Sequence, residues 1–371
     1  MAIYLSELTL ANFRTLRSAE LRLGRGLNVV GGPSAEGRAA IGEALCLLSI
    51  GKPLGTAVER EVVHRDLHES GGGVSAVQAV AHTSLFTTKS AVEIKLGVAP
   101  RGRLYTQKLF RINGVACSAL DFVGNNLVVH ASARSAAHHT ASSKGRRRFI
   151  DILVSQTDKQ YLKNISRYAK TLEQRTRLLR MVRAREAAPE DLHFWNDRLA
   201  YEGARVMVRR LAAVRELGGL VEEVSAAAGV PLPPALRYVA GTKLNPGPNP
   251  SLEALQAALR REFEAAQRHE LRSGRTLRGV QADDLSITSK GASPQLTALL
   301  LLLGAGRYIR AVTSERPILA LGDALGGIET PLAKRLIDLF GDYDQVVVSD
   351  HAGERVGGVL PAPDHRIELL A

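Results

Sequence analysis

The sequence predicts an α/β head domain that is split into two parts by an inserted helical arm. Strand-like segments dominate roughly the first third of the chain, helical periodicity follows, and buried-type strands return near the C-terminus. Consecutive apolar strands that alternate with a helix are typical of a parallel sheet covered on both faces. A chain of 371 residues is long enough for this arrangement. We expect the first half of the head at 1–150, the arm at 151–275 and the second half of the head at 276–371.

The N-terminal part begins with segments in which apolar and polar residues partly alternate, as in half-buried strands. Ile3–Leu10 and Ala19–Leu23 flank a turn at Asn12–Thr15, and Leu27–Val30 leads towards a helix at Ala39–Leu48. Further strands are expected at Val92–Val98, Gln107–Ile112 and Leu127–Val129. The dipeptide Asn113-Gly114 is a hairpin signal, because both residues tolerate positive φ.

The arm is predicted from long stretches with helical spacing. Apolar residues recur at intervals of three and four in a heptad-like seam of Leu162, Ile165, Ala169, Leu172 and Leu179. Basic residues keep the same rhythm on a neighbouring stripe of Lys163, Arg167, Lys170 and Arg177. Pro189 ends this pattern, a second helix is expected over 192–228, and a third over 251–271 after a Pro/Gly-rich segment. Two long helices joined by a Pro-containing turn predict an antiparallel arm.

The C-terminal part returns to the head. A strand is expected at Asp284–Thr288, followed by a strongly apolar helix at Gln295–Arg310. Two buried-type strands, Ile318–Leu321 and Gln345–Val348, then flank a helix at Pro331–Leu339. These strands are too apolar to stand alone, so we expect them to lie in one sheet with helices on both faces.

The composition excludes several classes of protein. Cys46 and Cys117 cannot build a disulfide framework, which fits a reducing compartment. The charged N-terminal residues leave no secretory signal, and the longest apolar run, 296–305, is about half of the ~20 residues that span a bilayer. No third ligand accompanies His64 and His68, so no metal site is expected there. We expect a cytoplasmic protein without a membrane partner.

The positive charge of the chain is concentrated. The net charge is +12, and the stretch from Lys144 to Arg215 holds 18 Lys/Arg against 8 Asp/Glu, an excess of 10. A concentrated basic surface suits a polyanion, most often nucleic acid, whereas a plain solvated helix surface is the alternative. Trp195, the only tryptophan, lies beside Phe194 and is expected to pack within the arm, with stacking on a base as the alternative.

A glycine-rich loop follows the third predicted strand. Its residues have the spacing of a phosphate-binding loop and are Gly32, Pro33, Ser34, Ala35, Glu36, Gly37, Arg38 and Ala39. The lysine position holds Arg38, whose planar fork is bulkier than an ammonium, and the metal-binding hydroxyl position holds Ala39. Ala35 stands where a glycine would let the backbone amides turn inward, and Glu36 places a carboxylate beside the anion path.

Several phrases of the chain resemble the RecF family of DNA replication and repair proteins. They include "YLSELTLANFRTLRSAEL", "LNVVGGPSAEG", "RINGVACSALDFVGNNLVV", "GRRRFIDILVSQTDKQYLKNISRYAKTLEQRTRLLR" and "GVQADDLSI". The resemblance runs nearly end to end. It implies an ABC-type, P-loop NTPase-like head related to structural-maintenance-of-chromosomes proteins, with a role in replication, recombinational repair and the SOS response. It also implies ATP and Mg²⁺ as ligands, with Arg14 near the nucleotide. Without a working loop, the alternative for Arg14 is packing or a salt bridge.

Four elements of the family pattern have lost most of their chemistry in this chain. The first is the phosphate loop. The second is the pair of acids that should end the strand at 317–321, where Gly322 replaces the metal-holding acid and Asp323 keeps the water-orienting position. The family's signature segment aligns with Gly291–Leu296, where Pro294 enters, and its Ser-Pro-Glu-Asp stretch aligns with Ser132–Ser135. Four separate losses predict a head in which ATP binding is weak or lost.

We therefore expect a RecF-like DNA-binding scaffold with little or no ATP turnover. The alternative is a weakly active ATPase clamp that binds ATP and DNA, retains Asp323 as a catalytic residue and helps to load a recombinase. DNA contacts are expected from Arg146, Arg147, Arg148, Lys163, Arg167, Lys170 and Arg177. The triplet 146–148 is the first candidate, and the alternative for it is a basic helix start with structural partners. The resemblance implies single-stranded or junction DNA, RecR/RecO-type mediator proteins and a homodimer as partners.

Overall fold

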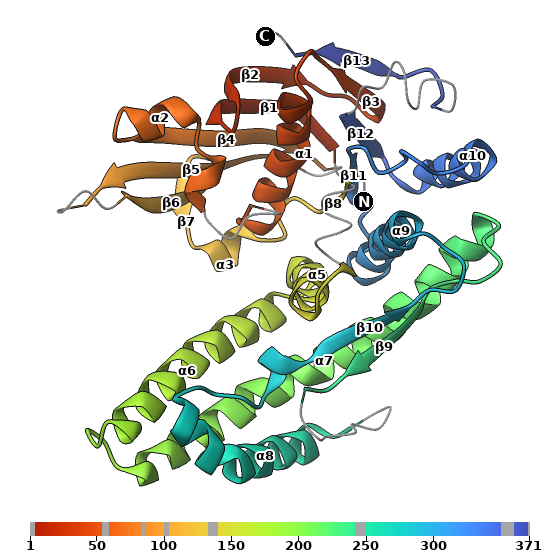
Figure 1. Cartoon of the computed structure of the whole chain (residues 1–371). Helices are drawn as coiled ribbons and strands as arrows, with labels where there is room; N and C mark the ends of the chain where they lie inside the picture. The colour runs from red at the N-terminus through yellow and green to blue at the C-terminus, as the bar shows by residue number, and fades with distance from the viewer. Residues whose placement is uncertain are drawn as a thin grey trace. The chain divides into compact units, whose positions relative to one another are not determined.

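The computed structural model describes residues 4–53, 59–83, 86–99, 104–132, 140–241, 250–349 and 360–369. The chain divides into two compact units (Figure 1). The head unit comprises Met1–Thr140, Gly219–Pro234 and Ser289–Ala371. The arm unit comprises Ala141–Gly218 and Ala235–Thr288.

One sheet of the head unit has, in the described part of the chain, six antiparallel strands in the order β2-β1-β4-β5-β6-β7. Their bounds are β1 Tyr4–Phe13, β2 Leu16–Arg22, β4 Gly73–His82, β5 Thr87–Val98, β6 Leu104–Ile112 and β7 Val115–Cys117. Asn113 and Gly114 join β6 to β7 with φ of 52° and 81°, as expected of the predicted hairpin turn. Strand β4 was not predicted from the sequence, because its alternate buried positions include small alanines, which weaken the strand signal.

The second sheet of the head unit is parallel, with the described order β13-β3-β12-β11-β8. Its strands are β3 Gly26–Gly31, β8 Val128–Ala131, β11 Ile318–Leu321, β12 Gln345–Ser349 and β13 His365–Glu368. In the described part of the chain, the helices of the unit are α1 Ala35–Ile50, α2 Arg65–Glu69, α3 Ala119–Phe122, α9 Pro294–Thr313, α10 Thr330–Asp338 and the last part of α7 Leu192–Ala227, from Gly219 on. Short 3₁₀ turns lie at Glu59–Val62 and Leu339–Asp342. Helix α1 contacts strands of both sheets, so it is central to the core.

Helix α9 is long and apolar enough, by length and composition alone, to cross a membrane. However, 67% of its most apolar window is buried inside the protein, and α9 packs on β8. A largely buried helix of this kind is typical of a protein core.

The arm unit is mainly helical. Its helices are α5 Ser143–Thr157, α6 Lys159–Arg183, the first part of α7 Leu192–Ala227, and α8 Leu252–Ser273, with 3₁₀ turns at Pro189–Asp191 and Val280–Ala282. Strands β9 Ala235–Val239 and β10 Asp284–Thr288 pair antiparallel. Strand β10 therefore belongs to the arm unit, whereas the sequence predicted it as part of the head. Residues 219–234 cluster with the head unit, so the compact units do not divide at 150 and 275 as expected.

The buried face of α6 differs from the predicted seam by one residue. Its buried side chains are Tyr161, Asn164, Tyr168, Thr171, Arg175 and Leu179. The predicted seam residues Leu162, Ile165 and Leu172 are half-buried, and Ala169 is exposed. Hydrophobicity alone misplaced the face, because Arg175 and Asn164 are buried with hydrogen-bond partners from the surrounding chain.

Candidate nucleotide and nucleic-acid sites

The glycine-rich loop begins where β3 ends, and Gly32 adopts φ of 142°. Helix α1 begins already at Ala35, with Ser34 as its N-cap. The Ser34 Oγ accepts a hydrogen bond from the Gly37 N–H at 3.1 Å, and the Ser34 carbonyl accepts one from the Arg38 N–H at 3.0 Å. These two amides are therefore held within the first turn of the helix.

The Arg38 side chain is also directed into the loop. It is 3% exposed, and its Nη1 donates a hydrogen bond to the Gly32 carbonyl oxygen. On the other side, the Leu369 N–H donates to the Gly31 carbonyl at 3.1 Å, and a Cβ on Gly32 would lie 2.9 Å from the Leu369 Cβ. The loop is thus packed from one side by an internal cation and from the other by the segment that follows β13.

A cavity of about 180 Å³ lies beside this loop in the head unit. It is lined by Ala35, Arg38, Ala39, Glu43, His130, Ser132, Gly322, Asp323 and Ser349. Neither Ala39 nor Gly322 carries a side-chain oxygen, and these are the two positions that would anchor Mg²⁺ in the family pattern. The residues present fit a Mg²⁺-nucleotide poorly. Among the described residues, no group of three or more His, Cys, Asp or Glu side chains is arranged to hold a metal ion.

His130 lines this cavity and was not predicted as a site residue from the sequence. It ends the apolar run of β8 and lies over Gly42 of α1, where a Cβ would be 2.5 Å from the His130 Nε2. Burial lowers the pKa of His130 to about 4, against the opposing effect of the Asp323 carboxylate. The imidazole is therefore neutral near pH 7. The sequence signal that could have indicated His130 is its position as the polar residue within the otherwise apolar strand β8.

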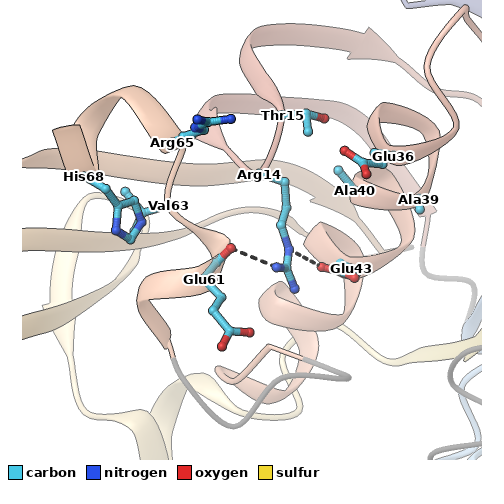
Figure 2. A pocket seen from close by; sticks show the side chains of 10 residues that line it. All are labelled: Arg14, Thr15, Glu36, Ala39, Ala40, Glu43, Glu61, Val63, Arg65 and His68. Atoms are coloured by element: carbon cyan, nitrogen blue, oxygen red, sulfur yellow. Dashed lines mark hydrogen bonds and ion pairs between the residues drawn. The ribbon is translucent and has the colours of Figure 1, made fainter.

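A larger cavity of about 480 Å³ lies along the outer face of α1 (Figure 2). Arg14 lies within it, and its Nε donates to the Glu43 carboxylate at 2.6 Å while its Nη1 donates to the Glu61 carbonyl at 2.8 Å. Arg14 has φ of 55°, unusual for a residue with a side chain. Glu36 and Glu43, seven residues apart, line the same cavity. Arg14 is thus paired with a carboxylate, as in the salt-bridge alternative for this residue, although its partner Glu43 was not predicted from the sequence.

The segment aligned with the family signature begins α9. Ser293 is the N-cap and accepts a hydrogen bond from the Leu296 N–H at 3.1 Å, while Pro294 is the first helical residue. The proline is accommodated because that position needs no N–H partner. It nevertheless removes one amide from the helix start, and the cap engages another. Of the stretch Ser132–Ser135, residues 133–135 lie outside the described residues.

The arginine triplet at the start of α5 is engaged within the arm unit. Arg146 binds both carboxylate oxygens of Asp284, at 2.9 and 2.7 Å, and Arg147 donates to the Asp283 carbonyl. Arg148 is half-buried, and burial lowers its pKa. These contacts attach α5 to the start of β10, and the Asp284 carboxylate neutralises much of the Arg146 charge.

The second group of predicted DNA-binding residues has a different environment. The side chains of Lys163, Arg167, Lys170 and Arg177 are all exposed on α6. Their spacing places them on one face of the helix along about 21 Å, taking ~1.5 Å per residue. We call these four residues the α6 stripe. Such outward-facing cations are suited to contacts with phosphate groups.

The class of the protein follows from these features: an α/β head of the nucleotide-binding ATPase type, split by a helical arm. The chain is 32% identical over 356 residues to the DNA replication and repair protein RecF of Herpetosiphon aurantiacus, which covers 90% of this chain and 89% of that protein. It is 31% identical over 353 residues to RecF of Thermomicrobium roseum, with 87% and 86% covered. The chain belongs to the RecF family of DNA replication and repair proteins. No family model matches the chain.

Solved structures agree with the fold. A structure of the recombination mediator protein RecF with ATPrS matches with a TM-score of 0.82 at 21% identity and covers 100% of this chain and 96% of that one. A RecF structure with ATP matches with a TM-score of 0.80, with 95% of each chain covered. The predicted ABC-type head split by an inserted arm is confirmed.

Proposed function

We propose that this RecF-family protein is a DNA-binding scaffold that does not run an ATP cycle. The main support is the glycine-rich loop, which is closed in the sense that its amides and its arginine are bonded to other groups of the loop. In phosphate-binding loops, free backbone amides and a lysine surround the phosphates and a hydroxyl holds Mg²⁺. Here the Gly37 and Arg38 amides are bonded to Ser34, and the Arg38 guanidinium is bonded to the Gly32 carbonyl.

The loss of both metal anchors supports the same proposal. Charge neutralisation by bridging Mg²⁺ is central to phosphoryl transfer, so a γ-phosphate without it has no stabilised transition state. Ala39 and Gly322 offer no metal ligand, and Asp323 could orient a water only towards a phosphate that is not held. The alternative function, a weakly active ATPase clamp, rests on Arg38 and Asp323 together with Mg²⁺ held through water. Of these two residues, Arg38 has its guanidinium bonded to the Gly32 carbonyl.

Calorimetry with ATP and Mg²⁺, together with a phosphate-release assay, tests this proposal. We expect no detectable binding at micromolar ATP and no hydrolysis above background. The double variant Arg38→Lys/Ala39→Thr should remain inactive until Gly322→Asp is added. That third change is itself crowded, because a Cβ at 322 would lie 3.1 Å from the Ser132 Cβ. Micromolar binding by the wild type, or turnover that Asp323→Asn abolishes, would favour the ATPase clamp instead.

The α6 stripe is proposed as the main contact with DNA phosphates, in place of the arginine triplet. Each phosphate contact releases counterions, so the logarithm of the affinity falls with the logarithm of the salt concentration by about 0.9 per contact on a duplex. Replacing all four stripe residues by alanine should weaken duplex binding and make this slope shallower by roughly 3 to 4. Fluorescence anisotropy over a salt series measures both quantities.

A matched control removes the same charge elsewhere on the arm unit. Arg260, Arg261, Arg268 and Arg272 of α8 are also exposed, and their replacement by alanine lowers the net charge equally. If the two quadruple variants behave alike, general charge and not the α6 stripe determines binding. Absence of DNA binding by the wild type at low salt would refute the scaffold proposal altogether.

Partners are proposed from the relatives. The matched structures describe RecF in the RecFOR pathway, and we propose RecR- or RecO-type mediators and a second copy of this chain as partners. Analytical ultracentrifugation with and without DNA tests the homodimer: a mass that stays that of one chain with DNA present at saturation would argue against it.

A further inference from the structure

Helix α7 carries a second exposed stripe that differs in chemistry from the α6 stripe. It consists of Phe194, Arg198, Tyr201, Arg205 and Arg209, spaced four, three, four and four residues apart; Arg205 is half-buried and the other four are exposed. This spacing places them on one face of the helix. Asn196 and Arg210, which bond to α6 through Arg175 and Tyr161, lie on the opposite face. The stripe from Phe194 to Arg205 therefore lies on the face opposite these contacts with α6, and Arg209 at its end bonds to Asp158, the N-cap of α6.

The aromatic rings of this stripe are unusually open. Phe194 is 66% exposed and Tyr201 is 36% exposed, although large apolar side chains normally favour burial. Trp195 packs against the Phe194 ring edge-on, with ring centroids 5.2 Å apart. The Phe194 ring thus has a supported position while much of its surface remains available to a ligand.

The arginines are arranged around the Tyr201 ring. The guanidinium carbon of Arg205 lies 3.5 Å from the ring centroid, and that of Arg198 lies 5.6 Å away. The Arg205 Nη1 also donates to the Tyr201 carbonyl at 3.3 Å, which helps to fix its position. Guanidinium groups held this close to an aromatic ring can form, together with the ring, a surface on which a further planar group stacks.

Most of the positive charge on this stripe is already balanced. Arg198 pairs with the buried Glu202 at 3.0 Å, and Arg209 donates to Asp158 at 2.7 Å. Asp197 nearby pairs with Arg260 at 3.2 Å. Binding here would therefore depend on stacking more than on phosphate attraction, which is the reverse of the α6 stripe.

We propose that the α7 stripe is a stacking platform for the unpaired bases of single-stranded nucleic acid. A duplex hides the faces of its bases, whereas an unpaired strand exposes planar faces along an anionic backbone, and it matches a row of aromatic rings separated by arginines. The exposed cations of the α6 stripe, which belong to the same arm unit, favour a nucleic acid over a protein as the partner of this unit. The inference deepens the proposed function and rests on it for the class of ligand.

Trp195 supplies a direct readout, because it is the only tryptophan and contacts Phe194. An oligothymidylate should quench its fluorescence, whereas an abasic oligonucleotide of the same length and a DNA duplex should not. The double variant Phe194→Ala/Tyr201→Ala should lose roughly tenfold or more in affinity for the oligothymidylate and retain its affinity for the duplex and the abasic strand. Both side chains are exposed, so the variant is expected to fold, and circular dichroism checks this.

The quadruple alanine variant of the α6 stripe separates the two ideas. It should lose duplex binding and keep the base-dependent part of the binding to single strands, seen as the difference between oligothymidylate and abasic affinities. Equal affinity of the wild type for those two strands, or an unchanged difference in the Phe194→Ala/Tyr201→Ala variant, overturns the α7 platform. Either result leaves the scaffold proposal standing, whereas failure of the wild type to bind any DNA removes both.

Discussion

The glycine-rich loop of the head and the α6 stripe of the arm place the same kind of residue in opposite situations. In the loop, Arg38 is buried and its guanidinium is used by the Gly32 carbonyl. In the stripe, Lys163 and Arg167 face water. A cation therefore marks a binding site for phosphate only where its hydrogen-bonding capacity is left for the ligand.

The same contrast recurs within α6. Arg175 is wholly buried and bonds to Glu270 at 2.7 Å, to Asn196 at 2.8 Å and to Thr276 at 2.9 Å, with its guanidinium over the Phe263 ring. Arg167, eight residues earlier, is exposed. Because Arg175 is buried and bonded, it is part of the core of the arm unit, whereas the exposed side chain of Arg167 is accessible to a ligand.

The largest expected effect comes from breaking the buried pair. Arg175→Leu leaves the Glu270 carboxylate buried without its cation, which costs about 3–5 kcal/mol of unfolding free energy. Chemical denaturation followed by circular dichroism measures the change. The matched control is Arg167→Leu on the same helix, where we expect a change within about 0.5 kcal/mol. Similar losses in both variants would mean that the buried network does not hold the arm together.

The next effect concerns pH and the cavity beside the loop. Because the folded-state pKa of His130, about 4, is lower than its ordinary value of 6.5, the folded protein favours the neutral ring. This stabilisation is complete above pH 6.5, is lost as the pH falls from 6.5 to 4, and amounts to roughly 3 kcal/mol by the relation between pKa shift and free energy. Denaturation curves at pH 7 and pH 4 should show this loss in the wild type.

The variant His130→Leu should lack that part of the acid destabilisation. His193→Leu, at an exposed position of the arm, is the control and should retain the pH dependence of the wild type. If His130→Leu and wild type lose equal stability between pH 7 and pH 4, the imidazole is not held neutral in the fold.

The smallest effect tests the closed loop directly. Ser34→Ala removes the Oγ that accepts the Gly37 N–H, and loss of an N-cap costs about 1 kcal/mol. Ser34→Asp keeps an acceptor at the cap and should remain close to the wild type in thermal denaturation. Equal stability of the alanine and aspartate variants would show that this side chain does not hold the first turn of α1.

Much of the architecture follows from local sequence. The strands Ile318–Leu321 and Gln345–Val348 were predictable because consecutive apolar residues match a sheet covered on both faces, and the structure places them in one parallel sheet. The Asn113-Gly114 turn and the long arm helices were predictable from φ preference and helical spacing. The spacing of the α6 stripe also indicated a common face, and its four side chains are exposed.

Tertiary structure alone decided which charged residues are available. Arg146 and Asp284 lie 138 residues apart, and Arg175 and Glu270 lie 95 apart, so no local pattern links them. A buried charge is tolerated only when a partner from elsewhere in the chain satisfies it, and burial of this kind cannot be seen in periodicity. The sequence by itself determined the elements and the family. The fold decided that Arg38, Arg146 and Arg175 hold the protein together while the α6 stripe faces water.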